Sequence, residues 1–170
     1  MRVQYSVGVE YALHSLLLLI HVPDGTSLGI RDIATYTGVG EGYLSKTFTK
    51  LTKAGLVRSI PGVKGGYQLA RASEQISLWE VVEAIEGPTP MFRCTEVRRQ
   101  CVLYQGQEIP EYVRCAPCTI NTLMLEAEQQ MRSYLQARTL AGLQQTLKEK
   151  LPPAHQEASR QWVQAAVTRR

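Results

Sequence analysis

Apolar residues recur at helical spacing along the first part of the chain and predict three helices. The first pattern covers residues 11–20, and a Pro-Asp-Gly turn at residues 23–25 ends it. Two shorter patterns follow at residues 30–37 and 41–54, with a glycine-rich turn at residues 38–40 between them. Two helices joined by such a turn are typical of a helix-turn-helix.

The pattern then changes from the period of a helix to that of a strand. Residues 56–60 and 67–70 form extended stretches, and the turn between them begins at Pro61 and carries Lys64 at its tip. Glycines in this turn allow backbone conformations that other residues avoid, and they allow the backbone to approach a phosphate closely. These glycines are Gly62, Gly65 and Gly66. A β-hairpin directly after the second helix makes a wing.

The second half of the chain predicts further helices. The motif SLWEVVEAIEGP has a capping box of Ser77 and Glu80 at its start and a Gly-Pro stop at its end. Residues 119–136 carry a long apolar stripe that needs a partner surface. We expect this surface to be the same helix of a second protomer, with packing inside one chain as the alternative. The stripe consists of Ile120, Leu123, Met124, Ala127, Met131, Tyr134 and Leu135.

Composition places the chain among ordinary globular proteins, with 44% hydrophobic and 20% charged residues. The longest apolar run, residues 16–20, is well short of the roughly 20 residues that span a bilayer, so we expect no membrane helix. The N-terminus also lacks the pattern of a secretory signal. We therefore expect a cytoplasmic protein. In that reducing compartment, grouped cysteines serve metal or redox chemistry more often than structural disulfides.

The net charge of +4 is unevenly distributed along the chain. Residues 31–71 contain seven Lys and Arg against two Asp and Glu, so this segment carries +5 and the rest of the chain sums to −1. A basic segment in an otherwise neutral protein is typical of a surface that binds phosphates.

Within that segment, the helix predicted at residues 41–54 has an apolar face and a basic face. At about 100° per residue, Leu44, Phe48 and Leu51 share the apolar face. The opposite arc bears hydroxyl and ammonium groups without a carboxylate, which suits the base edges and phosphates of a DNA major groove. A solvated lysine-rich face is the alternative, and the basic wing that follows favours DNA. The arc consists of Tyr43, Ser45, Lys46, Thr49, Lys50 and Lys53.

All the cysteines lie in one polar stretch, RCTEVRRQCVLYQGQEIPEYVRCAPC, at residues 93–118. Their spacing is C-x6-C-x13-C-x2-C, from Cys94, Cys101, Cys115 and Cys118. Four thiolates suit an iron-sulfur cluster or zinc, although structural zinc sites usually draw their ligands from two close pairs. Neighbouring arginines would lower thiol pKa values and so favour a thiol-disulfide switch. From spacing alone, the cluster, the switch, zinc and the absence of functional chemistry all stay open.

The stretch IRDIATYTGVGEGYLSKTFTKLTKAGLVRSIPGVKGGYQLAR resembles the winged helix-turn-helix of the Rrf-type bacterial regulators, the group of IscR, NsrR, RirA and CymR. The GVKGGYQLAR wing is its most specific part, and similarity in YSVGVEYALHSLLLLI and ISLWEVVEAIEG extends it over about residues 1–143. The resemblance implies a homodimer that binds a palindromic operator in double-stranded DNA through two recognition helices and two wings. By position, the implied readers are Tyr43, Ser45, Lys46 and Lys50 on the helix and Lys64, Gly65 and Gly66 on the wing.

The resemblance also implies an iron-sulfur cluster, because three cysteines at this location hold one in related regulators. Two features of this chain depart from that pattern. Thirteen residues separate Cys101 from Cys115, more than the family's short second gap, and Asn121 stands where some relatives have a histidine ligand. We therefore expect Cys115 to complete a set of four thiolates. The cluster is our first hypothesis for the cofactor, with zinc or no cofactor as alternatives.

These features predict a transcriptional regulator whose operator binding is modulated by a cluster that senses iron, redox state or nitric oxide, and not an enzyme. A thiol oxidoreductase using CAPC is a distant alternative, because the strand that precedes such a motif in a thioredoxin-like unit is missing. The chain contains no G-x-S-x-G, H-E-x-x-H or P-loop motif. Its three histidines, His14, His21 and His155, are dispersed in the sequence.

The expected fold class is mainly α with a small β-hairpin wing, that is, a winged helix-turn-helix followed by a long C-terminal dimerisation helix. We expect a DNA-binding domain at residues 1–87 and a cysteine-containing sensor loop at residues 88–118. A dimerisation helix region at residues 119–151 and a C-terminal tail at residues 152–170 would follow, separated by a Pro-Pro break.

Overall fold

A computed structural model describes residues 5–88 and 90–169 of the chain. It divides into two units, residues 1–88 with 135–170 and residues 89–134, and each is described by itself. The first unit contains α1 (Val7–Leu19), α2 (Ile30–Thr37), α3 (Glu41–Lys53), β1 (Val57–Ile60), β2 (Gly66–Leu69), η1 (Ser73–Gln75), α4 (Leu78–Glu86), α7 (Leu140–Lys150) and α8 (Pro153–Thr168). The second contains η2 (Val97–Gln100), η3 (Val102–Tyr104), α5 (Glu111–Arg114) and most of α6 (Thr119–Gln136).

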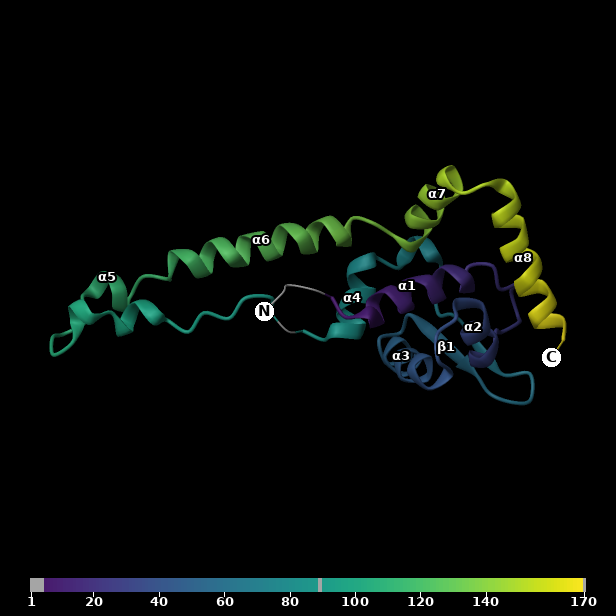
Figure 1. Cartoon of the computed structure of the whole chain (residues 1–170), viewed down its shortest axis with the longest axis horizontal. Helices are drawn as coiled ribbons and strands as arrows, with labels where there is room; N and C mark the ends of the chain where they lie inside the picture. The colour runs from purple at the N-terminus through teal and green to yellow at the C-terminus, as the bar shows by residue number, and fades with distance from the viewer. Residues whose placement is uncertain (1–4, 89, 170) are drawn as a thin grey trace. The chain divides into compact units, whose positions relative to one another are not determined.

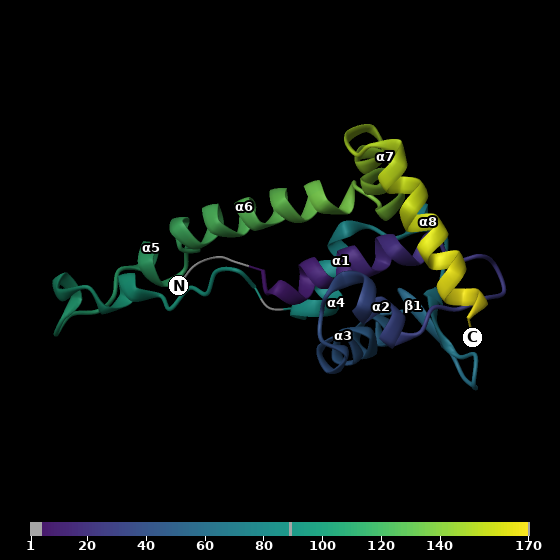
Figure 2. The same cartoon turned by 45° about the vertical axis from the view of Figure 1, so that its right-hand side comes forward.

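Helices α1, α2, α3 and α4 pack around the core of the first unit, and α1 lies between the α2–α3 pair and α7 (Figures 1 and 2). The apolar face predicted for α3 is fully buried, with Leu44, Phe48 and Leu51 each at 0% exposure. The predicted mainly helical fold with a two-stranded hairpin is therefore confirmed.

Helix α1 begins at Val7, four residues before the predicted start. Its first turn contains Gly8, where a Cβ would lie 3.0 Å from both the Ile85 side chain and the Tyr43 hydroxyl. A glycine near the start of a helical pattern suggests that the helix begins after it. Here Gly8 lies within α1 and allows this helix to pass close to α3 and α4.

The wing is an antiparallel pair of β1 and β2 in which Val57 faces Leu69 and Ile60 faces Gly66. A bridge ties it to the segment before α2, because Leu28 and Tyr67 exchange backbone hydrogen bonds of 3.0 and 2.8 Å. At Gly66 a Cβ would lie 2.5 Å from the Leu28 carbonyl oxygen, so only glycine fits at this crossing.

Helix α4 begins with the predicted capping box. The Ser77 hydroxyl accepts a hydrogen bond from the Glu80 backbone N–H, and the Glu80 carboxylate accepts one from the Ser77 N–H at 2.8 Å. Arg71 donates to the other carboxylate oxygen of Glu80 at 2.6 Å. Burial raises the pKa of Glu80, but the hydrogen bonds from Ser77 and Arg71 outweigh it, so the pKa lies below its ordinary value.

The C-terminal helices α7 and α8 belong to the first unit. The Leu140 side chain is fully buried, and its N–H donates to the Ile76 carbonyl at 2.8 Å. On α8 the Trp162 ring meets the Tyr36 ring of α2 edge-on, with centroids 5.0 Å apart. The long helix thus ends at Gln136, because the next turn is used to dock α7.

The second unit has few buried side chains, and many of its large apolar side chains are exposed. Val113 on α5 is buried at 4% exposure, whereas α6 has no buried residue in the part of the chain that the structure describes. Among the described helices, none is both long and apolar enough to cross a membrane.

Candidate DNA interface and cysteine segment

The side of α3 opposite its buried face carries two exposed lysines, Lys46 and Lys53. At about 100° per residue, both lie within about 20° of the direction opposite Leu44. Neither ammonium group has a hydrogen-bond or ion-pair partner among residues 5–88 and 90–169. Two unpaired cations on the outer face of a helix-turn-helix are available to phosphates.

Two further implied readers on this helix, Tyr43 and Lys50, lie on its flank and contact neighbouring helices. The Lys50 ammonium donates to the Ile85 carbonyl in the last turn of α4 at 2.6 Å. This carbonyl has no partner inside its own helix, and a cation there also interacts favourably with the helix dipole. The Tyr43 ring packs edge-on against Tyr11 of α1, with centroids 5.4 Å apart. Both side chains therefore help to hold α3 in place.

The hydroxyls on the basic arc bond back to their own helix. The Ser45 hydroxyl donates to the Glu41 carbonyl at 2.9 Å, and the Thr49 hydroxyl donates to the Ser45 carbonyl at 2.8 Å. Each hydroxyl oxygen can still accept a hydrogen bond.

The turn of the wing presents Lys64 with an exposed side chain, and the Lys64 carbonyl accepts a hydrogen bond from the Ser27 hydroxyl at 3.0 Å. A Cβ at Gly65 would lie 2.3 Å from the Ile60 carbonyl oxygen, so this glycine closes the turn. Sequence reasoning missed Val63 at the tip, which is fully exposed at 100%. Its position between Gly62 and Lys64 in the predicted turn could have indicated this exposure.

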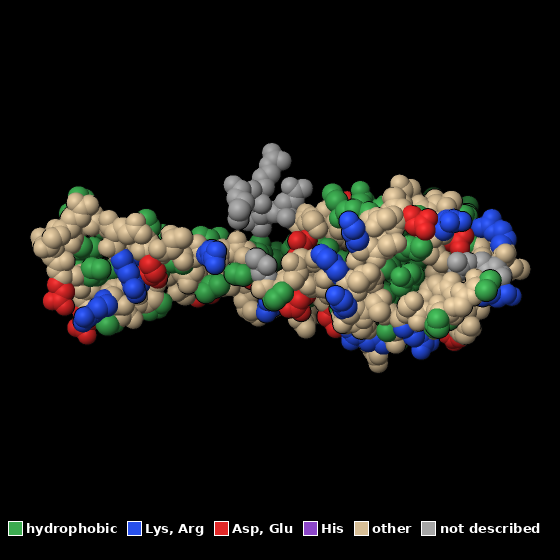
Figure 3. Space-filling model, turned by 90° about the horizontal axis from the view of Figure 1, so that it is seen from below, with side chains coloured by type: hydrophobic (Ala, Val, Ile, Leu, Met, Phe, Trp, Pro, Cys, Tyr) green, Lys and Arg blue, Asp and Glu red, His purple; other side chains and the backbone are tan. Residues whose placement is uncertain are grey.

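Basic side chains recur on the surface of the first unit, as Figure 3 shows from the side on which α3 lies in Figure 1. Arg31 on α2 was counted in the basic segment but not among the implied readers, and its side chain is 85% exposed and lies 3.7 Å from the Glu41 carboxylate at the start of α3. This exposed pair links the two helices only weakly. Arg31 is therefore a further cation at this surface.

The structure places two of the four cysteines, Cys94 and Cys118, near enough for the Cys94 thiol to influence the Cys118 thiol. The Glu96 backbone N–H donates to the Cys94 sulfur at 3.4 Å. Cys101 lies near Tyr104, and Cys115 is exposed at the end of α5. All four thiols are free of disulfides.

Cys118 directly precedes α6, and its sulfur faces the unpaired N–H groups of the first helical turn. The N–H of Asn121 lowers the pKa of the Cys118 thiol most strongly. Burial raises this pKa, and the N–H of Ile120, the Cys94 thiol and the Arg98 charge lower it further, so the net shift is downward. A thiol at a helix N-terminus is more readily ionised and more reactive than an ordinary one.

Arginines join the two ends of the cysteine segment. Arg98 donates to the carbonyls of Ala116 and Pro117, and Arg99 donates to the Arg114 carbonyl at 3.2 Å. The Glu96 carboxylate pairs with both Arg98 and Arg99, at 2.9 and 3.3 Å. These bonds hold the loop before Cys118 close to the segment that carries Cys94.

Comparison with known proteins identifies the group to which this winged protein belongs. The sequence model of the Rrf2 family, described as an iron-dependent transcriptional regulator, matches residues 5–146. The chain belongs to the Rrf2 family.

Relatives of this Rrf2-family chain are regulators. Protein rrf2 of Nitratidesulfovibrio vulgaris is 36% identical over 116 residues, which cover 68% of this chain and 70% of that protein. YwgB of Bacillus subtilis, named as a transcriptional regulator of the helix-turn-helix type, is 30% identical over 133 residues, covering 78% and 79%. The family and these relatives make the chain a DNA-binding transcriptional regulator and not an enzyme.

Solved structures share the fold of this Rrf2-family regulator. CymR, the global cysteine regulator of Bacillus subtilis, matches with a TM-score of 0.62 at 22% identity. The match covers 84% of this chain and 97% of CymR. IscR of T. potens matches with a TM-score of 0.64 at 21% identity and covers 88% and 91%. At these identities the match shows the winged-helix architecture.

The cysteines of this Rrf2-family regulator fit a metal cluster in chemistry but only in part in position. Thiolates are suitable cluster ligands, and Cys94 and Cys118 already adjoin each other. Within the described part of the chain, no three Cys, His, Asp or Glu side chains are gathered so that they could hold a metal ion. A cluster on all four cysteines would thus require Cys101 and Cys115 to move toward this pair.

Proposed function

We propose that this chain is a homodimeric regulator that binds a palindromic operator through α3 and the wing of each protomer. The observation that carries this proposal is the pair of exposed, unpaired lysines on α3, Lys46 and Lys53, opposite the buried face. Lys64 extends the same positive character to the wing. We propose that the regulator acts in the cytoplasm, together with the DNA that it binds.

The salt dependence of DNA binding tests this interface. Each lysine that neutralises one phosphate contributes about 0.9 to the slope of log K against log salt concentration. We expect Lys46→Ala, Lys53→Ala and Lys64→Ala each to reduce that slope by about this amount, measured on a duplex that the wild-type protein selects from a random pool. Lys150→Ala on α7 makes the same change in charge away from α3 and should leave the slope unchanged. Wild-type slopes in all three interface variants would refute the assignment.

The dimer is proposed from the apolar side chains on α6. Ile120 and Leu123 are 64% and 60% exposed. A long apolar stripe of this kind is stable in water when a second helix covers it. We expect Leu123→Glu to convert the dimer to a monomer in sedimentation experiments. Gln129→Glu, on the polar side of the same helix, should stay dimeric, and a monomeric wild type would reject the proposal.

We propose that signal sensing takes place at the cysteine segment, with an iron-sulfur cluster on Cys94, Cys101, Cys115 and Cys118 as the first candidate. The support is the thiolate set and the iron-dependent description of the family. The cluster would supply an iron-based response to oxidants or nitric oxide. Protein purified without oxygen should contain iron and acid-labile sulfide, and Cys94→Ala should lose both. Protein that contains neither would reject the cluster.

A thiol-disulfide switch is the second candidate, and the contact between Cys94 and Cys118 favours it. The Cys118 thiolate would attack one oxygen of a peroxide and release the other as hydroxide, which gives a sulfenic acid. The Cys94 thiolate would then attack the Cys118 sulfur and release water after protonation, which forms the disulfide. Overall, two thiols are oxidised and the peroxide is reduced to two water molecules.

The reactivity of Cys118 tests the switch independently of iron. In metal-free protein, iodoacetamide should label Cys118 faster than Cys115 at neutral pH, because a helix N-terminus stabilises the thiolate. In a separate, unlabelled sample, hydrogen peroxide should remove two hydrogen atoms per chain from the wild type, and peptide mapping should find the Cys94–Cys118 bond. Disulfide formation at wild-type rate in Cys118→Ser would contradict this pairing.

A further inference from the structure

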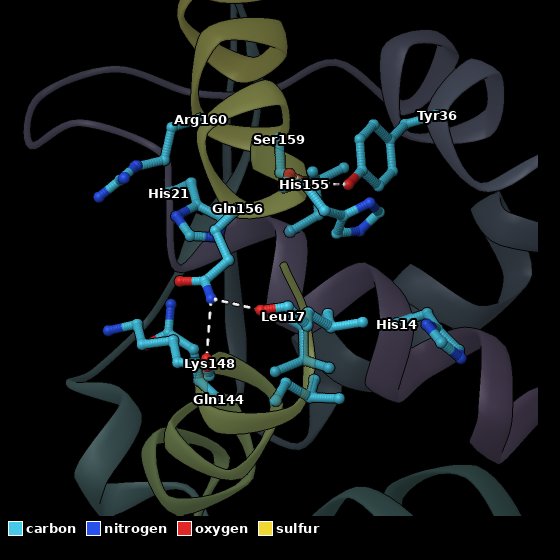
Figure 4. A pocket seen from close by; sticks show the side chains of 13 residues that line it. His14, Leu17, His21, Tyr36, Gln144, Lys148, His155, Gln156, Ser159 and Arg160 are labelled. Carbon is cyan, nitrogen blue, oxygen red and sulfur yellow. Dashed lines mark hydrogen bonds between the residues drawn. The ribbon is translucent and has the colours of Figure 1, made fainter. Parts of the chain in front are cut away.

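A pocket of about 340 Å³ lies within the first unit, between α1, α2, α7 and α8 (Figure 4). Four leucines give it an apolar lining, two from α1 and two from α7 and its end. They are Leu17, Leu18, Leu147 and Leu151. At about 30 Å³ for each non-hydrogen atom, the share of one water molecule in the liquid, the space holds about ten such atoms. It is therefore large enough for a small organic molecule.

Hydrogen bonds between separate helices hold the walls of this pocket. The Tyr36 hydroxyl of α2 lies 2.7 Å from the Ser159 hydroxyl of α8. At the junction of α7 and α8, the Gln156 side-chain nitrogen donates to the carbonyls of Lys148 and Leu151, at 2.9 and 3.1 Å. The pocket is thus built by the fold and is closed on two sides by polar contacts.

The polar side of the pocket is positively charged. In Figure 4, Arg160, His21 and Lys148 lie along one side of the pocket, whereas Tyr36 and His14 lie along the other. No Asp or Glu occurs among the described residues that line it. Arg160 pairs with Glu157 at 2.8 Å, but both side chains are more than half exposed, so this pair is weak.

The state of His21 is consistent with this positive field. Burial lowers the pKa of His21 most strongly, and the charges of Arg160 and Lys148 lower it further. Near neutral pH the imidazole is therefore neutral, with one N–H donor and one acceptor nitrogen. An anion in the pocket would reduce the positive potential and stabilise the charged imidazole.

We propose that this pocket is a binding site for a small monocarboxylate with a compact apolar body. The carboxylate would face Lys148 and Arg160, and the apolar part would lie on the leucines. A neutral apolar ligand would leave the two cations without a counter-charge, and an inorganic anion would leave the leucine lining uncovered. This site is separate from the DNA interface and the cysteine segment, so its existence does not rest on the function proposed for either.

Octanoate is a suitable probe, because its ten non-hydrogen atoms match the estimated space of about ten. Titration calorimetry on the full, reduced chain should give saturable binding of octanoate, weaker binding of 1-octanol and the weakest binding of octylammonium. Lys148→Gln should weaken octanoate binding about three- to tenfold, as expected for loss of one partly exposed charged hydrogen bond. Lys150→Gln, an equal change in charge on the same helix but outside the lining, should bind octanoate as the wild type does.

A second readout locates the ligand. The NMR signal of the His21 ring should titrate at higher pH with octanoate bound, because the carboxylate stabilises the imidazolium. The proposal is overturned by any of three results: no saturable octanoate binding, equal affinity for octanoate and octylammonium, or an equal loss in Lys148→Gln and Lys150→Gln. An unchanged His21 titration at saturating octanoate would overturn it as well.

Discussion

Replacing Gly66 by alanine tests the contact that joins the wing to the rest of the first unit. The new Cβ would lie 2.5 Å from the Leu28 carbonyl oxygen and 3.0 Å from the Gly29 nitrogen, both of which are backbone atoms. These atoms cannot rotate away as the end of a side chain can. The two chain segments must therefore separate, by about 0.9 Å if ordinary van der Waals contact is to be restored.

That separation determines the expected loss of stability. It would lengthen the two Leu28–Tyr67 hydrogen bonds from 2.8 and 3.0 Å to beyond hydrogen-bonding distance. At about 1 kcal/mol for each bond, the free energy of unfolding should fall by about 2 kcal/mol, which is within the usual range for overpacking. Gly42→Ala is the matched control, because nothing lies within 4 Å of its Cβ position in α3. In this helix, alanine should raise the stability by up to about 1 kcal/mol.

Urea unfolding of the full chain at one fixed protomer concentration measures both variants, since the stability of an oligomer depends on concentration. Amide hydrogen exchange adds local information. In Gly66→Ala the Tyr67 and Leu28 amides should lose protection, while amides in the middle of α3 keep theirs. If Gly66→Ala unfolds within about 0.5 kcal/mol of the wild type, the typical effect of a surface substitution, the close approach of the wing to Leu28 is refuted.

Two further predictions concern charged groups that stabilise helix ends. Lys50→Met keeps the length of the side chain but removes the hydrogen bond to the Ile85 carbonyl. The free energy of unfolding in urea should therefore fall by about 0.5–1.5 kcal/mol, and an unchanged value would contradict this capping role. The pKa of Glu80 is lowered, because its hydrogen bonds with Ser77 and Arg71 outweigh the effect of burial. The ionised carboxylate therefore stabilises the fold above the unfolded-state pKa, and this stabilisation is lost as the pH falls through the folded-state pKa. The stability gap between wild type and Glu80→Gln should accordingly be widest near about pH 7 and narrow toward about pH 3, and a gap that is constant with pH would show that the charge of Glu80 does not matter.

The division of roles on α3 could have been predicted from helix geometry. Relative to Leu44, Lys46 and Lys53 lie at about 200° and 180°, whereas Lys50 and Tyr43 lie at about 240° and 260°. The latter pair is thus displaced toward one flank, and the structure shows that α1 and α4 lie on this flank. Helix geometry alone could not show which neighbouring helix covers the edge of the basic arc, because that depends on tertiary packing.

Other features were less accessible from the sequence. His14 and His21 are seven residues apart, about two helical turns, and this spacing indicates a shared face. Nothing in the sequence indicates that His155 from α8 joins them at the same pocket, because that requires knowledge of how α8 packs. Similarly, Cys118 next to a predicted helix start could have indicated a thiol with a lowered pKa, whereas its contact with Cys94 depends on a loop closed by arginines.

The contrast between the two units bears on how a cysteine signal would act. In the first unit, the buried face of α3, its bond from Lys50 to α4 and the wing contact at Gly66 all fix the surface that we propose to read DNA. In the second unit, Val113 is buried but every described residue of α6 stays at least partly exposed, so few apolar contacts oppose rearrangement. Oxidation or cluster binding at Cys118 therefore needs less free energy to rearrange the second unit than to disturb the reading surface. Regulation through the second unit would accordingly change the pairing of protomers while each winged domain keeps its own affinity for a half-site.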